Sequence, residues 1–409
     1  MAISLPSFAK INLGLRIGPL RPDGFHELRT VYQTIALHDI VSVSVGRGSG
    51  IEIRSDDPRV PLDSTNTCFR IVERAMEALK ARGRVVIEIE KRLPVQGGLG
   101  GASGNAVAAL LGLEKASRKS LPAPERLRIA AEVGSDLPLF FIGGTVLGVS
   151  RGEEAYPLPD LPAMACVVAL PEIAVSTPKA FADWDTLCGA GALSANSGQA
   201  PAREDEVNKV VATDPAPKSE NATAFGTGTT TGKGTASSRA EPSRHDDRAL
   251  APEIFAEHSS ARTGEIALPH AGSSKLTPPT HSDRMLEFSR EISAWLSAVP
   301  IAGRRRSGVS AIGGGRAENL LLDLVRTGIE NDFEKVVFPK YPEMREVKRV
   351  LEQSGARYAS LSGSGSAIYG LFNSRERAAA AAKKLTRHGT RAVVTSTLTR
   401  QQYWKALSH

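Results

Sequence analysis

The glycine-rich stretch at 94–105 has the composition of a loop that binds an anion. An alternating apolar segment at 85–89 precedes it and predicts a strand, and the segment at 106–111 follows it and predicts a helix. Glycine permits positive φ and lets a ligand approach the backbone, while the free N–H groups at a helix start point toward one place. Because the helix dipole adds roughly half a positive charge there, the stretch predicts a phosphate site. The alternative is a tight turn that binds nothing.

This stretch matches neither of the two commonest phosphate loops. A Walker loop closes with Gly-Lys-Ser or Gly-Lys-Thr, whereas this chain has Ser103, Gly104 and Asn105 at that place. In a dinucleotide-binding loop an acidic residue follows at a strand end about 20 residues later, and neither Glu114 nor Glu125 falls at one. The glycine-rich stretch alone therefore does not identify a phosphate site, and the residues around it matter.

Lys10 and Asn12 lie two residues apart in a segment where polar and apolar residues alternate, which predicts a half-buried strand. Side chains at this spacing project from one face and can reach the same ligand. The alternative is a solvated polar edge. The Pro-Asp-Gly sequence at 22–24 predicts a turn that presents Phe25 and His26 together.

Asp136 follows an amphipathic segment at 123–133 that predicts a helix. In the short loop after that helix, a carboxylate is either a cap or a reactive group. Asn66 precedes a helical pattern at 71–79, so it either caps this helix or contacts a ligand. A second loop of small residues, 362–366, either closes over a polyphosphate opposite the first loop or is a plain connection.

The remaining periodicity predicts a mixed α/β protein. Further strands are expected at 31–37, 41–45, 51–53, 163–170, 358–361, 367–372 and 392–397, and further helices at 285–296, 320–325, 342–355 and 378–385. A loop is expected at 313–315, and the basic tail at 400–409 is expected to be frayed.

Length and composition predict a soluble protein of two domains. The 409 residues exceed the ~150 typical of one domain. With 41% hydrophobic and 23% charged residues, the chain has the balance of a globular protein. No run of 18 apolar residues occurs, so no membrane segment is expected. Residues 1–6 lack the features of a signal peptide, so we expect a cytoplasmic protein.

The net charge of +7 favours anionic small molecules as ligands. Nucleic acid is not expected, because the basic residues are dispersed and lack an interleaved aromatic platform. The three cysteines, Cys68, Cys166 and Cys188, are far apart and without CxxC spacing. They support neither a disulfide framework nor a zinc site.

The composition changes sharply between about 189 and 280. This segment is rich in Gly, Ala, Ser, Thr and Pro, and Phe225 and Phe255 are its only aromatic residues of the Phe, Tyr or Trp type. Such a segment buries too little apolar surface to offset its ordering entropy, so we expect a disordered insertion. It leaves a first domain at 1–160 and a second at 161–188 and 281–409.

Taken in order, these pieces resemble the GHMP small-molecule kinases. The blocks that carry the resemblance are residues 9–13, 21–28, 94–105, 134–138, 175–177, 331–334 and 361–366. Within the family, Asp-Gly-Phe-His at 23–26 and Asn-Asp-Phe-Glu at 331–334 favour the kinase of a cytidine-diphosphate-linked sugar alcohol over homoserine or mevalonate kinase.

The resemblance implies a ribosomal-S5-like N-terminal domain and a ferredoxin-like second domain, with the active site between them. It implies that Lys10 and Asp136 are the catalytic pair and that Asn12 and His26 contact substrate. Phe25 and Phe181 stand where aromatic rings clasp the cytosine. The residues implied to bind ATP are Pro94, Val95, Gln96, Gly97, Gly98, Leu99, Gly100, Gly101, Ala102, Ser103, Gly104 and, as an adenine contact, Asn66.

The implied reaction is the ATP-dependent phosphorylation of the tertiary 2-hydroxyl of a methylerythritol moiety, in non-mevalonate isoprenoid precursor biosynthesis. Mg²⁺ is expected as the charge neutraliser, although no residue is identifiable as its ligand. The alternatives are another GHMP kinase, of the homoserine or mevalonate type, and a nucleotide-binding protein without turnover. We expect a monomer or a homodimer.

The chain departs from the family pattern at several of these positions. Gln96 and Ala102 replace small or glycine positions, and Gly104 replaces a residue that is often serine. The last change leaves open whether a hydroxyl contacts phosphate or metal there. Phe25 replaces the commoner tyrosine, which keeps the ring and removes a hydrogen-bond donor.

Overall fold

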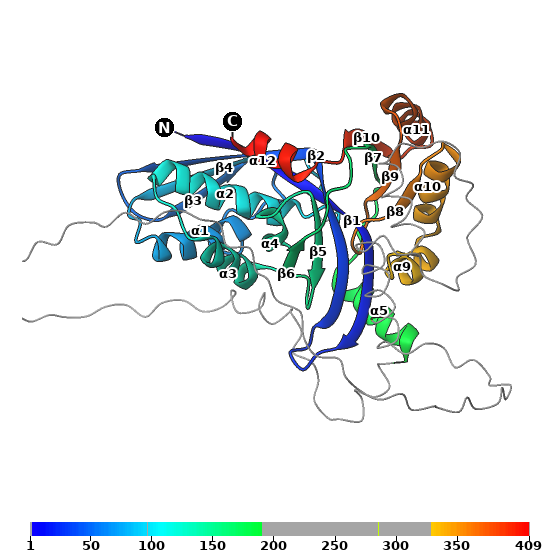
Figure 1. Cartoon of the computed structure of the whole chain (residues 1–409), viewed down its shortest axis with the longest axis horizontal. Helices are drawn as coiled ribbons and strands as arrows, with labels where there is room; N and C mark the ends of the chain where they lie inside the picture. The colour runs from blue at the N-terminus through cyan, green and yellow to red at the C-terminus, as the bar shows by residue number, and fades with distance from the viewer. Residues whose placement is uncertain (1, 96, 190–284, 286–328, 409) are drawn as a thin grey trace, which may run out of the picture. The chain divides into compact units, whose positions relative to one another are not determined.

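The computed structural model describes residues 2–95, 97–189, 285 and 329–408 (Figure 1). All of them belong to one compact unit of the chain. The insertion expected at 189–280, the helix at 320–325, the loop at 313–315 and Gln96 lie outside the described residues, apart from Gly189. So does the helix expected at 285–296, apart from Met285.

The first sheet is built around a long antiparallel hairpin. Its strands are β1 (Ile3–Leu20), β2 (His26–Gly46), β3 (Ile51–Ser55), β4 (Arg84–Glu90), β5 (Thr145–Val149) and β6 (Glu154–Pro157). The hydrogen-bonded order is β3-β4-β2-β5-β6, and β1 pairs with β2. The two strands expected at 31–37 and 41–45 are one continuous strand, because β1 supplies pairing partners along nearly the whole of β2.

Helices from distant parts of the chain pack together with the first sheet (Figure 1). They are α1 (Thr67–Ala78), α2 (Gly101–Ser117), α3 (Ala123–Val133), α4 (Leu137–Phe140) and α12 (Arg400–Ser408). α2 is apolar nearly all round, from Ala106 to Leu113, and such a helix is buried. It packs between α1 and the β1–β2 hairpin.

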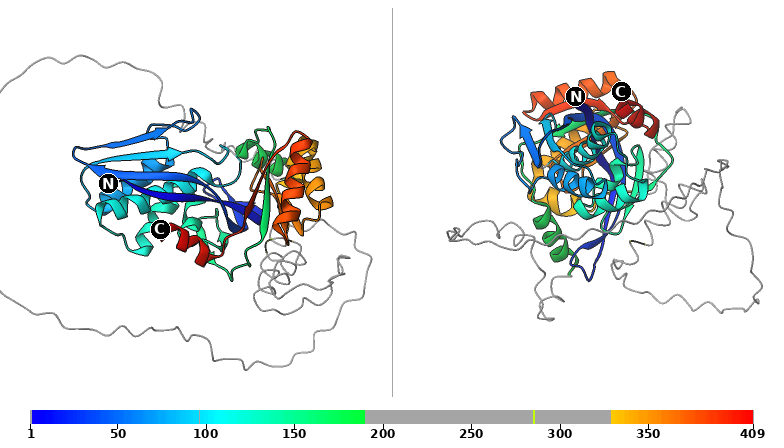
Figure 2. Two further views of the ribbon diagram at one scale, coloured as in Figure 1. Left: turned by 90° about the horizontal axis from the view of Figure 1, so that it is seen from above. Right: turned by 90° about the vertical axis from the view of Figure 1, so that its left-hand side faces the viewer.

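The second sheet has four antiparallel strands in the order β10-β7-β9-β8. These are β7 (Ala165–Leu170), β8 (Tyr358–Leu361), β9 (Ile368–Phe372) and β10 (Arg391–Ser396). If these four strands are numbered along the chain, their order in the sheet is 4-1-3-2. The helices α10 (Pro342–Gln353) and α11 (Arg375–Arg387) pack side by side on this sheet (Figure 2). This strand order with two helices on the sheet is a ferredoxin-like arrangement. Two further helices, α5 (Thr177–Cys188) and α9 (Glu334–Lys340), pack against each other.

β1 runs through the cores of both sheets. Its first part, with Leu5 and Phe8, packs with the helices of the first sheet. Ile11 packs in a cluster shared with β7 and β9, and Ile17 packs among residues of the second sheet and its helices. Because side chains alternate along a strand, Lys10 and Asn12 face away from Ile11, and a single strand holds them in place between the two sheets.

The expectation that residues 400–409 are frayed is wrong. α12 is a helix in which Tyr403 and Leu407 are buried. Tyr403 Oη donates a 2.6 Å hydrogen bond to the Phe140 carbonyl, and Trp404 Nε1 donates one of 2.9 Å to the Ile142 carbonyl. The apolar pair at i and i+4 was the signal of a buried helical face.

None of the described helices has both the length and the apolar character needed to cross a membrane. Cys68, Cys166 and Cys188 are free thiols, the first two buried and the third exposed.

Candidate active site

Lys10 stands at the centre of the site and is only 3% exposed. Its Nζ donates hydrogen bonds of 2.7 Å to Asn12 Oδ1 and 2.9 Å to the Gly98 carbonyl, and lies 3.4 Å from Asp136 Oδ2. The structure therefore brings together the strand residues, the glycine-rich loop and the carboxylate that the sequence pattern singled out separately.

Asp136 precedes α4 and is held from two strands of the sheet. Tyr32 Oη on β2 donates a 3.0 Å hydrogen bond to Oδ1, while Oδ2 faces Lys10 on β1. Burial, with the Asp136 charge adding to it, raises the pKa of Tyr32 well above its ordinary value, so the phenol remains a proton donor. The Asp136 side chain is 33% exposed, which leaves it accessible to a ligand.

The β1–β2 register explains why Tyr32 reaches the site. Asn12 pairs with Tyr32 across the hairpin, and paired residues lie on the same face of an antiparallel sheet. Asn12 Nδ2 also donates a 2.8 Å hydrogen bond to Thr30 Oγ1. This bond directs the Asn12 carbonyl oxygen toward Lys10. Sequence analysis missed Tyr32 and Thr30, because two register shifts lie between the Pro-Asp-Gly turn and Asn12, so the turn alone does not give this pairing.

The glycine-rich loop lies directly against Lys10. Leu99 accepts a 2.9 Å hydrogen bond from the Lys10 amide. Gly100, with φ of +68°, is the N-cap of α2, and a Cβ there would lie 3.0 Å from Lys10 Cγ. No side chain caps this helix, so the amides of its first turn, from Gly101 to Ser103, are the donors for an anion.

The second loop, residues 362–366, packs against the first. Ser362 Oγ donates a 2.9 Å hydrogen bond to the Gly98 carbonyl, and the Ala367 amide donates one of 3.2 Å to the Gly97 carbonyl. Gly98 has φ of +71°, and a Cβ there would lie 2.1 Å from the Ser362 carbonyl oxygen. Beside this contact a cavity of about 370 Å³ is lined by Gly98, Gly365 and residues 174–178.

The absence of a hydroxyl at Gly104 has a packing reason. A Cβ at this position would lie 2.8 Å from the Phe8 carbonyl oxygen and 2.9 Å from Ser7 Oγ, because α2 approaches β1 closely there. A serine at 104 would push the helix away from the strand. Pro94 and Val95 lead into the loop and are partly buried, Leu99 is buried, and Ala102 is exposed in the first turn of α2.

Asn66 is a helix cap. Its Oδ1 accepts a 2.8 Å hydrogen bond from the Cys68 amide at the start of α1, and its Nδ2 donates one of 2.7 Å to the Pro61 carbonyl. Both ends of the amide therefore have protein partners. The adenine contact expected of Asn66 stays a prediction.

The residues expected to hold the cytosine form two separate pairs. His26 stacks on Phe181 with ring centroids 5.0 Å apart and planes within 4°, which leaves no space for a third ring between them. Its ring nitrogens lie 3.1 Å from the Gly18 carbonyl and 3.2 Å from Asp185 Oδ1. Phe25 is 42% exposed and lies beneath the Arg151 guanidinium. The clasp by Phe25 and Phe181 stays a prediction.

The described part of the chain contains no group of three or more His, Cys, Asp or Glu side chains that would hold a metal ion. Mg²⁺ in nucleotide sites is commonly bound by phosphate oxygens with one or two carboxylates rather than by a protein cage. The described residues are compatible with Mg²⁺ bound mainly through the ATP phosphates, and no carboxylate among them is assigned to the ion.

Two family models match the chain. The model of the GHMP kinase N-terminal domain matches residues 66–144, and that of the GHMP kinase C-terminal region matches residues 316–391. Together they include the glycine-rich loop, Asp136 and the second loop. They confirm the mixed α/β fold with GHMP kinase N-terminal and C-terminal domains.

Curated relatives named 4-diphosphocytidyl-2-C-methyl-D-erythritol kinase align with the chain. That of Solibacter usitatus is 30% identical over 371 residues, which is 91% of this chain and 81% of the relative. That of Acaryochloris marina is 41% identical over 181 residues, 44% of this chain and 58% of the relative. That of Synechococcus elongatus is 39% identical over 206 residues, 50% and 64%. The last two alignments span less than two thirds of the relatives' length.

Solved structures share the fold. A crystal structure of 4-(cytidine 5'-diphospho)-2C-methyl-D-erythritol kinase has a TM-score of 0.56 at 22% identity, covering 97% of this chain and 99% of its own. A homoserine kinase from Cytophaga hutchinsonii has a TM-score of 0.57 at 17% identity, covering 98% and 96%. At these identities the likeness concerns the fold alone.

Proposed function

Since the chain belongs to the 4-diphosphocytidyl-2-C-methyl-D-erythritol kinase family of the GHMP kinases, we propose that it transfers the γ-phosphoryl group of ATP to the 2-hydroxyl of that cytidylylated alcohol. The products are the 2-phosphate and ADP. This reaction places the protein in isoprenoid precursor biosynthesis by the non-mevalonate route.

The position of Lys10 is the observation that supports this proposal. One ammonium group contacts both the carbonyl of Gly98, in the loop suited to phosphate, and the carboxylate of Asp136. A nucleotide bound at the loop and an alcohol bound at Asp136 therefore meet within the reach of one side chain. Holding two reactants in line in this way contributes as much as ~7–11 kcal/mol in well-oriented systems.

Asp136 is the proposed general base. The tertiary hydroxyl is a crowded nucleophile, so transfer of its proton to Asp136 as the oxygen attacks the γ-phosphorus is worth roughly 10²–10⁴-fold in rate. The bond between the γ-phosphorus and the ADP oxygen breaks as the new P–O bond forms. Tyr32 fixes one carboxylate oxygen and leaves the carboxylate partly exposed to the substrate.

Lys10 is the proposed electrostatic catalyst. Lys10 is 3% exposed and its ammonium is fixed by Asn12 and Gly98, so it does not have to reorient as negative charge develops on the phosphoryl oxygens. The amides at the start of α2 bind the ATP phosphates in this scheme. Mg²⁺ supplies further neutralisation of the phosphates when bound.

The substrate's cytidine end is assigned to the far end of the β1–β2 hairpin. Phe25 offers an exposed ring, and the next residue, His26, stacks on Phe181. Aromatic rings of this kind stack on a base. Asn12, which follows Lys10 along β1 in the direction of the hairpin turn, is the proposed contact to the alcohol portion.

The experiment is a comparison of acceptors. The purified protein is assayed for ADP release with ATP and each of three alcohols, the cytidylylated methylerythritol, mevalonate and homoserine. Turnover with the first alone is the expected result. Turnover only with one of the others would assign a different GHMP kinase activity, and ATP binding without ADP release from any of them would assign a nucleotide-binding protein.

A further inference from the structure

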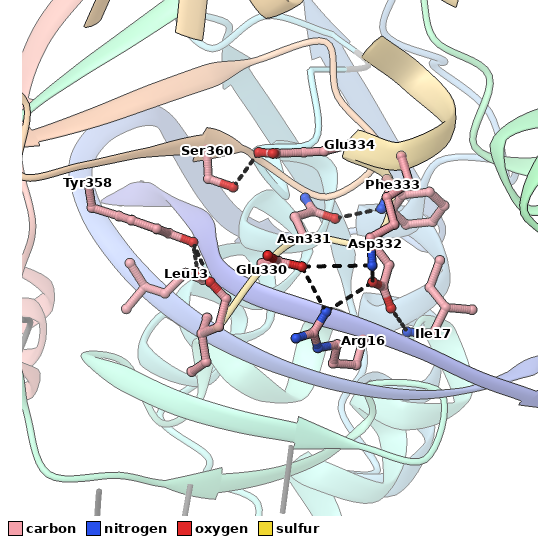
Figure 3. A network of polar contacts seen from close by, with 12 residues as sticks. Leu13, Arg16, Ile17, Glu330, Asn331, Asp332, Phe333, Glu334, Tyr358 and Ser360 are labelled. Carbon is pink, nitrogen blue, oxygen red and sulfur yellow. Dashed lines mark hydrogen bonds and ion pairs between the residues drawn. The ribbon is translucent and has the colours of Figure 1, made fainter. Parts of the chain in front are cut away.

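The segment at 330–334 lies beside β1 (Figure 3) and contacts the second loop, but it contains none of the residues assigned to the reaction. It follows β1 closely, because the Leu15 amide donates a 2.9 Å hydrogen bond to the Glu330 carbonyl and the Asp332 amide donates one of 2.9 Å to the Leu15 carbonyl. The segment is therefore fixed to the strand that positions Lys10.

A buried carboxylate strengthens this attachment. Asp332 is 0% exposed, and its carboxylate accepts hydrogen bonds from the Ile17 amide at 3.0 Å and from the Arg16 guanidinium at 3.2 Å (Figure 3). Lys335 Nζ lies 3.1 Å from the same carboxylate. A buried charge with several such partners holds the segment in one register on β1.

Asn331 connects this fixed segment to the second loop. It is 1% exposed, and its Nδ2 donates hydrogen bonds of 2.9 Å to the Leu361 carbonyl and 2.8 Å to the Gly363 carbonyl. Its Oδ1 accepts a 3.1 Å hydrogen bond from the Phe333 amide, which orients the side chain (Figure 3). The two carbonyls belong to buried residues, so water cannot replace the amide donor without rearrangement of the loop.

The second loop in turn fixes the glycine-rich loop. Ser362 lies between the two residues whose carbonyls Asn331 holds, and Ser362 Oγ donates to the Gly98 carbonyl that also accepts from Lys10 Nζ. A Cβ at Gly363 would lie 3.6 Å from Asn12 Oδ1 and 3.7 Å from Lys10 Nζ. Asn331 is thus connected to both parts of the active site through one short loop.

We propose that Asn331 is a positioning residue for nucleotide binding. It holds residues 361–363 so that Ser362 fixes the Gly98 carbonyl, and the orientation of Gly98 directs the following amides of the glycine-rich loop toward the phosphates. This inference rests on the proposed function, because it assigns the loop to a nucleotide. It adds Asn331 to a site whose proposed catalytic residues, Lys10 and Asp136, come from the first half of the chain.

The test compares Asn331→Leu with Tyr358→Phe. Leucine keeps the branching of asparagine but donates no hydrogen bond. Tyr358 Oη donates hydrogen bonds of 2.6 Å to the Leu13 carbonyl and 3.3 Å to the Ile329 carbonyl (Figure 3). Among the described residues it has no hydrogen bond to the second loop. Tyr358→Phe is therefore a control that removes a hydrogen bond to β1 but leaves the bonds between Asn331 and the second loop in place.

For each variant we measure the Kd of a non-hydrolysable ATP analogue by calorimetry, kcat, and the KM of both substrates. Asn331→Leu is expected to weaken nucleotide binding and lower kcat, each by roughly tenfold or more, as loss of a positioning contact worth one to two hydrogen bonds implies. The KM of the cytidylylated alcohol is expected to stay unchanged. Tyr358→Phe is expected to lower only the thermal midpoint. Equal nucleotide affinity and kcat in the two variants would overturn the proposal.

A second variant keeps the proposal testable if Asn331→Leu does not fold. Ser362→Ala removes only the hydroxyl that holds the Gly98 carbonyl, and it is expected to show the same loss of nucleotide affinity. Unchanged affinity in Ser362→Ala would contradict the proposed connection. Because the binding measurement needs no turnover, an unaltered protein that binds the analogue but does not phosphorylate the alcohol would refute the proposed function and leave this test valid.

Discussion

Replacing Asp136 by asparagine separates the proposed chemistry from folding. Asparagine keeps the shape of the side chain, and its carbonyl oxygen can accept the 3.0 Å hydrogen bond that Tyr32 gives to Oδ1. The substitution removes the negative charge 3.4 Å from Lys10 Nζ and the basic oxygen that would take the proton. We therefore expect a large effect on turnover and a small one on stability.

The loss of the ion pair sets the change in stability. The Asp136 side chain is 33% exposed and that of Lys10 is 4% exposed, so the pair is intermediate between a surface pair and a buried one. At the observed 3.4 Å, Coulomb's law gives about 1 kcal/mol in water and about 5 kcal/mol at an effective dielectric constant of 20. Lys10 keeps Asn12 and Gly98 as acceptors, so the free energy of unfolding should fall by about 1–2 kcal/mol.

The change in turnover follows from the loss of the base. We expect kcat of Asp136→Asn to fall by roughly 10²–10⁴-fold. The Kd of ATP should change little, because the amides of the glycine-rich loop are untouched. ADP release gives kcat, calorimetry gives the Kd, and urea unfolding gives the stability. Turnover close to that of the unaltered protein would refute the assignment of Asp136 as base.

Asp57→Asn is the matched control. This carboxylate is also partly exposed and pairs with Arg59, which with a backbone hydrogen bond lowers the pKa of Asp57 to about 2. It lies after β3 and has no contact with Lys10 among the interactions of the described residues. Its substitution should leave kcat unchanged. An equal loss of activity in both variants would show that charge removal alone, and not the base, explains the effect.

Three further predictions concern other parts of the site and the core. Gly98→Ala should lower the free energy of unfolding, measured in urea, by about 2 kcal/mol or more and should weaken ATP binding, because the new Cβ clashes with the Ser362 carbonyl and the left-handed backbone is strained for alanine. At Gly97 a Cβ would meet no backbone atom, so Gly97→Ala is the control. Equal free energies of unfolding for the two variants would contradict this prediction. Tyr403→Phe should lower the free energy of unfolding by about 1–3 kcal/mol, since it removes the buried donor to the Phe140 carbonyl at the C-terminal end of α4, the helix that Asp136 precedes. A stability equal to that of the unaltered protein would contradict the role of α12. Burial raises the pKa of Cys68 from its usual value near 9 to about 12. Between these pH values the unfolded chain binds fewer protons than the folded one, so the free energy of unfolding should fall as pH rises through that range. Cys68→Ala should reduce the slope of the free energy of unfolding against pH, and an identical slope would count against the burial of this thiol.

Local sequence patterns predicted the strand, the loop and the helix end that carry the site residues, because each of these is determined by residues adjacent in the chain. The period of two in β1 placed Lys10 and Asn12 on one face, and the change of period after Gly100 located the start of α2. Asp136 was located by the end of the helix before it. The same reasoning failed for α12, because its two buried apolar side chains stabilise a helix only when α4 and the first sheet are present to pack against.

The sequence by itself determined the glycine-rich loop, the pair on β1 and the family to which the chain belongs, because backbone geometry and side-chain period are properties of short segments. Only the tertiary structure decided that Tyr32 holds Asp136, that Gly104 is required by the approach of α2 to β1, and that Asn331 reaches the loop at 361–363. These relations join residues far apart in the chain, and they arise from the strand register and helix packing that the folded core imposes.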